Sequence, residues 1–369
     1  MATVVFAPDS FKGSATAAAV AEALADGWAS VRPADRVVRV PMADGGEGTL
    51  DAFEAAVPGS HRHPVRVTGP DGAEREAGWL ALPDGSAVVE LAEASGIAAM
   101  PALAPFDAQT VGFGQAIAAA LDAGATRLLL GIGGSASTDG GAGMLTALGA
   151  RLLDGSGSVV SPGNRGLAAV ERVELAGLRP LPPGGAHILS DVTSPLLGAD
   201  GAAAVFGPQK GARDEDVAIL ESGLARFVKA VQEAGVDIDP ATPGAGAAGG
   251  TGYGLLVWGA LAAPGASAVG DALRLPSVLA SADVVVTGEG RYDSQSAAGK
   301  VPEYVAGLAT AAGIPALLAA GSIAAEPSRF AAAESLSELA GGSAAAIAEP
   351  LRWAHAAGAA LARTFTAAP

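Results

Sequence analysis

Residues 128–148 (LLLGIGGSASTDGGAGMLTAL) place an apolar run, a glycine-rich loop and a second apolar run directly after one another. The first run is typical of a buried strand, and the second has the pattern of a helix. Glycine lets backbone N–H groups come close to a ligand, and the start of a helix carries donors without helical partners. The segment therefore predicts a strand, loop and helix of an α/β domain, with Gly133, Gly134 and Ser135 as candidate phosphate-binding residues.

Strands and helices alternate near both ends of the chain. Residues 3–7 and 37–40 are short apolar runs, and the apolar side chains between positions 20 and 31 recur at helical spacing. Similar strand-like runs return at 283–287 and 315–320, with a predicted helix that begins at 301. This alternation predicts a parallel sheet covered by helices.

The middle of the chain has a different pattern of apolar and turn residues. From about residue 65, three apolar runs are separated by Pro-Asp-Gly turns at 70–72 and 83–85, which is typical of antiparallel strands. We therefore expect two α/β domains. Residues 1–63 and 280–369 form a doubly wound domain with a parallel sheet, and residues 64–279 form an inserted domain with a mixed sheet.

Acidic residues stand beside glycine where several predicted strands end. Ligands of open parallel sheets bind outside the carboxyl ends of the strands. Carboxylate oxygens suit Mg²⁺, and phosphoryl transfer needs a metal ion, cations on the phosphates and a carboxylate near the acceptor hydroxyl. Each carboxylate taken alone is more typical of a helix cap or a turn, but together they predict a site for Mg²⁺ and phosphate. These residues are Asp9, Asp44, Glu47, Asp139, Asp191, Glu289 and Asp293.

The chain is acidic, with a formal net charge of −16, which disfavours nucleic acid as a partner. Of its 22 basic residues only four are lysines, yet three of these (Lys12, Lys210 and Lys300) stand in glycine-containing loops. Lysine is a flexible point charge suited to phosphate. We therefore expect Lys12 and Lys300, which precede predicted helices, to bind an anion.

Several functional classes are excluded by composition. Cysteine is absent, so disulfides, thiolate nucleophiles and cysteine-ligated metals are not expected. No apolar run reaches the roughly 18 residues of a membrane span, and the N-terminus lacks the basic region of a signal peptide. These features predict a soluble, cytoplasmic protein without a membrane partner. Gly244, Gly246 and Gly249 form a GxGxxG, but Pro240 and Pro243 precede it instead of a strand, so a nicotinamide oxidoreductase is a minor alternative.

Seven segments, in chain order, resemble the motif series of the type-1 glycerate kinase family. They are APDSFKGS (7–14), PMADGGEGT (41–49), ELAEASGI (90–97), GIGGSASTDGGAGM (131–144), SPLLGADGAAAVFGPQKGA (194–212), GAGAAGG (244–250) and TGEGRYD with GK (287–300). The resemblance continues to about residue 322. It implies one flavodoxin-like domain and one domain similar to a restriction-endonuclease core. It also implies ATP-dependent phosphorylation of D-glycerate, usually to 2-phosphoglycerate, with ATP and Mg²⁺ as cofactors.

The site residues that we expect come from these motifs. The expected catalytic residues are Asp191, Lys12 and Asp293. The expected substrate- or phosphate-binding residues are Ser10, Asp44, Gly45, Gly46, Gly133, Gly134, Ser135, Arg291 and Lys300. The expected Mg²⁺ ligands are Asp191, Asp44 and Glu289. Association into a homo-oligomer is left open.

The chain departs from the family pattern at two places. Where the family generally reads CDVDNPLLG, this chain has Thr193 and Ser194 in place of an Asp and an Asn. Around 291–300, Tyr292, Ser294 and Ala298 are altered. Two alternatives therefore stay open beside the glycerate kinase hypothesis: a kinase for a related small hydroxy acid, and a non-catalytic relative that binds the anion alone.

Overall fold

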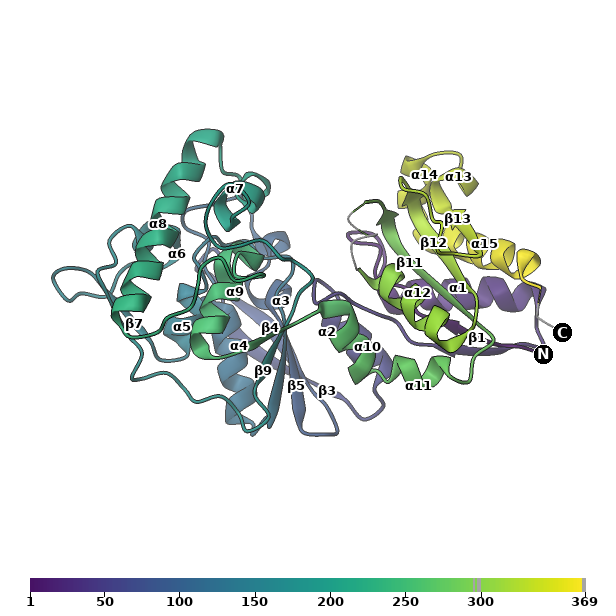
Figure 1. Cartoon of the computed structure of the whole chain (residues 1–369), viewed down its shortest axis with the longest axis horizontal. Coiled ribbons are helices and arrows are strands. Elements are labelled where there is room, and N and C mark those ends of the chain that lie inside the picture. The colour runs from purple at the N-terminus through teal and green to yellow at the C-terminus, as the bar shows by residue number, and fades with distance from the viewer. Residues whose placement is uncertain (295, 297–299, 367–369) are drawn as a thin grey trace. The chain divides into compact units, whose positions relative to one another are not determined.

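The computed structural model describes residues 1–294, 296 and 300–366 of the chain. The chain divides into two compact units, each with its own sheet (Figure 1). The first unit contains Met1–Asp44, Asp51–Pro58 and Pro264–Pro369, and the second contains Gly45–Leu50 and Gly59–Ala263. The first unit is thus built from both ends of the chain. Its boundaries lie near residues 58 and 264, where the sequence suggested 63 and 280.

The first unit alternates strands and helices. Its elements are β1 (Thr3–Phe6), α1 (Ala17–Val31), β2 (Arg36–Arg39), α2 (Thr49–Ala56, whose first two residues group with the second unit), α10 (Gly265–Ala272), α11 (Leu275–Leu279), β11 (Val284–Tyr292), α12 (Val301–Ala312), β12 (Ala316–Ile323), β13 (Ala332–Ser335), α13 (Leu336–Leu339), α14 (Ser343–Ala348) and α15 (Pro350–Thr364). The sheet has the order β13-β12-β11-β1-β2, and every neighbouring pair is parallel. Counted within the unit this is the order 2-1-3-4-5 of flavodoxin-like folds, so the predicted doubly wound sheet is confirmed.

One face of this sheet packs against α1 and α15. Val4 and Val286 from two central strands lie in one buried cluster with Leu24 of α1 and Leu361 of α15. Strand residues two apart point to the same side of a sheet, so this face is set by every second residue. The intervening Val5 and its partner Val285 on β11 face the opposite side and are also buried. This explains why these strands appear in the sequence as continuous apolar runs.

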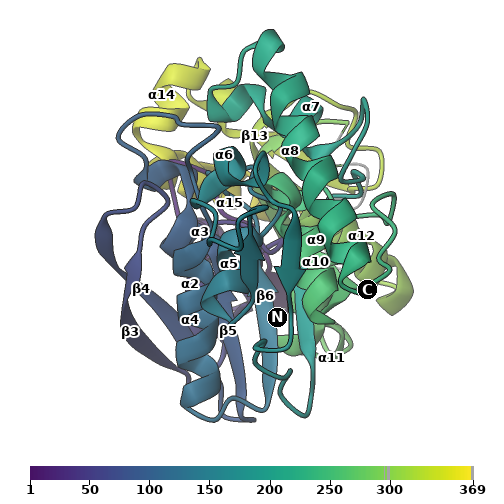
Figure 2. The same ribbon diagram turned by 90° about the vertical axis from the view of Figure 1, so that its left-hand side faces the viewer.

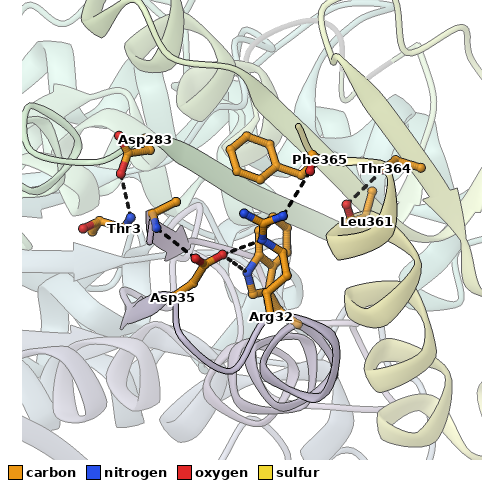
Figure 3. Close-up of polar contacts among 9 residues, drawn as sticks. Thr3, Arg32, Asp35, Asp283, Leu361, Thr364 and Phe365 are labelled. Carbon is orange, nitrogen blue, oxygen red and sulfur yellow. Dashed lines mark hydrogen bonds and ion pairs between the residues drawn. The ribbon is translucent and has the colours of Figure 1, made fainter. Parts of the chain in front are cut away.

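Hydrogen bonds around Asp35 fix the C-terminal segment to the same unit (Figure 3). Its carboxylate accepts hydrogen bonds from the Ala2 backbone N–H (2.9 Å), Trp28 Nε1 (3.2 Å) and Arg32 Nε (2.6 Å). Arg32 also donates to the Phe365 carbonyl at 3.3 Å. The end of α1, the start of β1 and the end of α15 therefore share one polar cluster.

The second unit holds the hairpins that the sequence predicted. Its elements are β3 (His61–Thr68), β4 (Glu74–Ala81), β5 (Ser86–Glu90), α3 (Leu91–Ser95), η1 (Ile97–Ala99), α4 (Val111–Asp122), β6 (Arg127–Gly131), α5 (Ala142–Ala147), β7 (Arg151–Leu153), α6 (Gly163–Leu167), β8 (Arg172–Glu174), β9 (Ala186–Leu189), α7 (Ala202–Phe206), η2 (Pro208–Lys210), α8 (Asp214–Glu233), α9 (Ala247–Trp258) and β10 (Leu261–Ala263).

The main sheet of this unit is mixed, in the order β10-β9-β6-β5-β4-β3. Strands β3, β4 and β5 pair antiparallel, whereas β5, β6, β9 and β10 pair parallel. Helix α4 lies along the strands of the hairpins, as Figure 2 shows. Its Phe113 and Ile117 share a buried core with Leu130 of β6 and Phe227 of α8. None of the helices in the described part of the chain combines the length and the apolarity needed to cross a membrane.

Two segments differ from the elements expected from sequence. The sequence predicts a strand at 283–287, but β11 continues to Tyr292 because it pairs with β12 as far as Ile323. The segment with Pro240, Pro243 and the GxGxxG was given no helix, but α9 begins within it at Ala247. This helix carries three residues with positive φ near its start, Ala248, Gly249 and Gly250, so it is kinked there.

Candidate functional site

A cavity of about 410 Å³ lies in the first unit, at the carboxyl ends of β1 and β11. These are the two strands at which the strand order of a flavodoxin-like sheet reverses, where such folds bind their ligands. The cavity brings together Asp9, from the acidic residues at predicted strand ends, and seven of the expected catalytic, binding and metal-ligating residues: Ser10, Lys12, Asp44, Glu289, Arg291, Asp293 and Lys300. Its volume falls in the roughly 300–1,000 Å³ range of small-molecule sites.

The turn after β1 presents Lys12 to this cavity. The Asp9 N–H donates to the Gly288 carbonyl of β11 at 2.8 Å, which continues the strand pairing beyond β1. Phe11 then pairs with Ala15 in a short bridge, so that Lys12 stands at the tip of a tight turn. The ammonium of Lys12 forms an ion pair with Asp44 at 3.2 Å, while 56% of the side chain stays exposed. Its position suits a point charge that an anionic ligand can recruit.

Carboxylates crowd the inner part of the cavity. Burial, together with the nearby charges of Asp44 and Glu289, raises the pKa of Asp9 well above its usual value. Burial raises the pKa of Glu289 to about 7 as well. The charge of Asp44 in turn raises the pKa of Lys12. Burial and mutual repulsion therefore disfavour the charged forms of these carboxylates, and a bound cation would stabilise those forms.

Two further cations, Arg291 and Lys300, line the cavity. Arg291 lies on β11 two residues after Glu289, and residues two apart on a strand share one face. The Nε atom of Arg291 is 3.3 Å from Asp293 Oδ2, which holds the guanidinium beside the cavity. Lys300 is the residue at the N-cap of α12. The structure thus brings the three predicted cations Lys12, Arg291 and Lys300 to one space.

The oxygens of this cavity fit a hard divalent cation. The Oε1 atom of Glu289 is buried and has no hydrogen-bond partner among the residues that the structure describes. No cluster of three or more acidic or histidine side chains with the geometry of a metal site occurs in the described ranges. Mg²⁺ commonly uses one or two carboxylates and completes its shell with water and substrate phosphates. The residues present fit such a nucleotide-bound ion rather than a closed protein cage.

The second unit holds the remaining predicted residues. Asp191 follows β9, and the loop with Gly133, Gly134 and Ser135 follows β6. Strands β6 and β9 are parallel neighbours in which Gly131 is paired with Leu189. Asp191 and this loop therefore leave the same edge of the sheet from adjacent strands.

Three of the predicted glycines allow close contact between backbones. The Gly133 N–H donates to the Gly45 carbonyl at 3.0 Å. A Cβ on Gly133 would lie 2.5 Å from the Gly46 Cα, and a Cβ on Gly45 would overlap the backbone of Leu189. The Gly133 donor is therefore used within the protein, and these glycines are needed for the close approach. Gly134, by contrast, is exposed.

The expectation that the start of α5 offers free donors is wrong. The fully buried carboxylate of Asp139 accepts the N–H groups of Gly141 (3.1 Å) and Gly143 (3.2 Å). The Met144 N–H donates to Thr110 Oγ1 at 2.9 Å, and that hydroxyl donates to Asp139 at 2.8 Å. The protein supplies its own anion where the sequence suggested a phosphate: Asp139 lies two and four residues before the N–H groups that it accepts, and the Thr110 hydroxyl, 29 positions from Asp139, occupies a further donor.

The glycine-rich segment 244–254 packs against the loop that precedes α5. The Gly140 N–H donates to the Gly249 carbonyl at 3.1 Å, and a Cβ on Gly250 would lie 2.9 Å from the Gly140 Cα. The Nζ atom of buried Lys210 donates to the Ser137 carbonyl in the same loop. The preceding long element is helix α8 rather than a strand, so these glycines serve backbone contact and not a dinucleotide fingerprint.

The sequence missed one wall of the cavity in the first unit. Leu336, Ala346, Ile347 and Pro350 line it from α13, α14 and the start of α15. The apolar pattern of these helices predicts burial in general, and no local signal distinguishes a cavity wall from a core.

The departures from the family pattern fall in different surroundings. Thr193 is exposed, and the Ser194 carbonyl accepts the Gly246 N–H at 3.0 Å. Tyr292 is buried, and its hydroxyl donates to Glu303 at 2.7 Å. Ser294 is exposed, and Ala298 lies outside the described residues.

Comparison with known proteins agrees with the motifs. The sequence model of the glycerate kinase family matches residues 4–366. The chain is 42% identical over 326 residues to a glycerate 2-kinase of Escherichia coli (strain K12), covering 87% of this chain and 85% of that protein. It is 43% identical over 325 residues to a glycerate kinase of Bacillus subtilis (strain 168), with coverage of 87% and 85%.

A solved structure extends the similarity to the fold. A crystal structure from Salmonella typhimurium LT2, described under the name glycerate kinase 2, superposes with a TM-score of 0.85 at 38% sequence identity. The superposition covers 98% of each chain. Motifs, sequence identity and fold agree over nearly the whole length, and this chain therefore belongs to the glycerate kinase family.

Proposed function

We propose that the protein transfers the γ-phosphoryl group of ATP to the 2-hydroxyl of D-glycerate, giving 2-phosphoglycerate, ADP and a proton. The observation that carries this proposal is the cavity at the ends of β1 and β11, where three cations and several carboxylates line one space. The name of the Escherichia coli relative, glycerate 2-kinase, supports the position of transfer. We also propose that the two compact units are the two domains of the enzyme.

Each proposed role follows from the charge and shape of the side chain. Lys12 and Lys300 bind the ATP phosphates as point charges, with Ser10 beside them. Arg291, whose planar fork matches a carboxylate, binds glycerate. Asp293 holds Arg291 through their 3.3 Å ion pair and acts with Lys12 and Asp191 as the catalytic set.

Magnesium is proposed to be held by Asp44 and Glu289, with Asp191 as the third ligand. When bound, the ion would neutralise charge on the phosphate oxygens of the nucleotide. Burial raises the pKa of Glu289 to about 7 in spite of the nearby charges of Lys300 and Lys12, so a bound cation would stabilise its charged form. An alternative role for Asp191 is that of the base for the acceptor hydroxyl, because it follows a buried strand and lies at the carboxyl end of the sheet.

The proposal is tested by ADP release from Mg-ATP in the presence of D-glycerate. The product is identified by ³¹P NMR, which separates 2- from 3-phosphoglycerate. We expect 2-phosphoglycerate and no turnover with EDTA. ADP release only with another hydroxy acid would assign a different acceptor, and binding of glycerate without ADP release would favour a non-catalytic relative.

We expect Asp191→Asn to reduce turnover at least tenfold, because the change keeps the shape of the side chain and removes its charge. The matched control is Asp200→Asn, an exposed aspartate in the same segment of the second unit, which should leave turnover unchanged. The measurement is kcat at saturating Mg-ATP and D-glycerate. Turnover of Asp191→Asn within tenfold of the parent would contradict the assignment.

We expect Arg291→Lys to raise the KM for D-glycerate about ten- to a hundredfold and the KM for ATP much less. A lysine keeps the charge but loses the bidentate fork, and a charge-assisted hydrogen bond contributes roughly 1.5–3 kcal/mol. Arg352→Lys is the control, since Arg352 is also exposed and paired with an acid, Glu349, at 2.7 Å. The reverse pattern, with ATP affected more, would assign Arg291 to the nucleotide.

A further inference from the structure

The cavity of the first unit has a charged part and an apolar part. The charged part lies at the ends of β1 and β11 and contains Lys12 and Lys300. The apolar part is formed by the C-terminal helices, which contribute Leu336, Ala346 and Ile347. The apolar part follows β13, which lies two places from β11 in the sheet. A ligand that fills the cavity therefore needs anionic and apolar ends.

Ile347 is the least covered residue of this wall. It is 66% exposed, whereas Leu336 and Ala346 beside it in the cavity lining are buried. A single exposed aliphatic residue is common on protein surfaces. Here it borders a concave site together with buried apolar neighbours, which is the composition of a ligand wall.

The two substrates of the proposed reaction differ in what they can place on this wall. D-Glycerate has three carbons and each carries oxygen, so it has no apolar surface to bury. A nucleotide carries a planar base with apolar faces at one end and phosphates at the other. The cavity volume of about 410 Å³ also exceeds what a three-carbon acid needs. Only the nucleotide matches both parts.

We propose that the wall of Leu336, Ala346, Ile347 and Pro350 is the subsite for the adenine base, with the phosphates directed to Lys12 and Lys300. This inference rests on the proposed use of ATP. Ser322, at the end of β12, lines the cavity from the strand between the two parts. The C-terminal helices thereby determine nucleotide affinity, while the strand ends bind the phosphates.

The test compares a ligand that has the base with one that lacks it. Binding of Mg-ADP and of Mg-pyrophosphate is measured by titration calorimetry, which does not require turnover. In Ile347→Asn we expect the Kd for Mg-ADP to rise three- to tenfold and the Kd for Mg-pyrophosphate to stay within twofold. Leu351→Asn is the matched control, because Leu351 is also exposed (42%) but does not line the cavity. Both ligands should bind this control as they bind the parent.

Two results would overturn the subsite. An unchanged Kd for Mg-ADP in Ile347→Asn would place the base elsewhere, and an equal rise for both ligands would assign Ile347 to the phosphates or to general structure. Failure of the proposed function would give a different result. If the parent binds Mg-ADP but releases no ADP from Mg-ATP in the presence of D-glycerate, the proposed reaction is contradicted and the proposed subsite is not. A parent that binds neither ligand contradicts both.

Discussion

Replacing Asp139 with alanine is expected to lower the free energy of unfolding by about 3–5 kcal/mol. The side chain is fully buried and accepts hydrogen bonds from the Thr110 backbone N–H (3.0 Å) and hydroxyl (2.8 Å) and from the N–H groups of Gly141 and Gly143. Alanine would leave these donors buried without an acceptor, and each such group costs roughly 1–3 kcal/mol. Part of the loss should be recovered in Asp139→Asn, which keeps one acceptor oxygen.

The control for this prediction is Asp154→Ala. Asp154 also accepts several hydrogen bonds, from the Ser156 N–H (2.9 Å) and hydroxyl (2.7 Å) and from the Ser158 N–H (3.0 Å), but it lies in a solvated turn. Water can replace Asp154, so its removal should change stability little. The measurement is chemical unfolding of both variants and the parent. Equal effects of the two alanine variants would show that burial of Asp139 does not stabilise the loop.

Lys210→Met is expected to remove most of the rise in stability that the parent shows between pH 7.5 and 9.5. Lys210 is only 2% exposed, and burial lowers its pKa to about 7, against the opposing effect of the Asp139 charge. Between pH 7 and the ordinary lysine pKa of 10.5, the unfolded chain binds a proton that the folded protein does not. The parent therefore gains stability as pH rises through this window, by about 2 kcal/mol between pH 7.5 and 9.5.

Methionine has no titrating group, so the variant lacks this gain. The free energy of unfolding of the variant, compared with that of the parent, should therefore be most favourable near pH 7 and should be lower at pH 9.5. Lys229→Met serves as control, because Lys229 is 76% exposed and paired with Glu233 on the surface of α8. The prediction is tested by measuring the free energy of unfolding of the parent and of both variants at three pH values. A Lys210→Met curve parallel to that of the parent would mean that the ammonium stays charged in the folded protein.

Most of the strands and long helices follow from the sequence because they depend on local patterns. The buried strand at the N-terminus, the helix of 15 residues after it and the amphipathic α8 all have the predicted periodicity. The Pro-Asp-Gly turns correctly separate the antiparallel strands β3, β4 and β5. The alternation at the two chain ends predicts the parallel sheet, and the motif series predicts the family. These features need only a few neighbouring residues.

Part of the candidate site also follows from sequence. Strand ends with glycine and a charged side chain predict residues at the carboxyl end of a sheet, and seven charged residues, with Asp9 among them, line one cavity. Their pairing does not follow, since the ion pair between Lys12 and Asp44 joins two loops 32 residues apart. The apolar wall cannot be predicted from the sequence either. Helices α13 to α15 line the cavity because of where the strand order of the sheet places them, and this order is not a local feature of the sequence.

The sequence by itself therefore determined the elements, the two kinds of sheet and the chemical character of the strand ends, because periodicity, turn residues and charge act over short distances. Only the tertiary structure decided which donors are free. The helix start after Gly141 looks like a phosphate cradle in sequence, yet Asp139 and Thr110 occupy its N–H groups. Likewise, β11 extends to Tyr292 because β12 offers a partner strand. A backbone group is satisfied by whatever the fold brings to it, and in both cases one of those neighbours, Thr110 or β12, is remote in the chain.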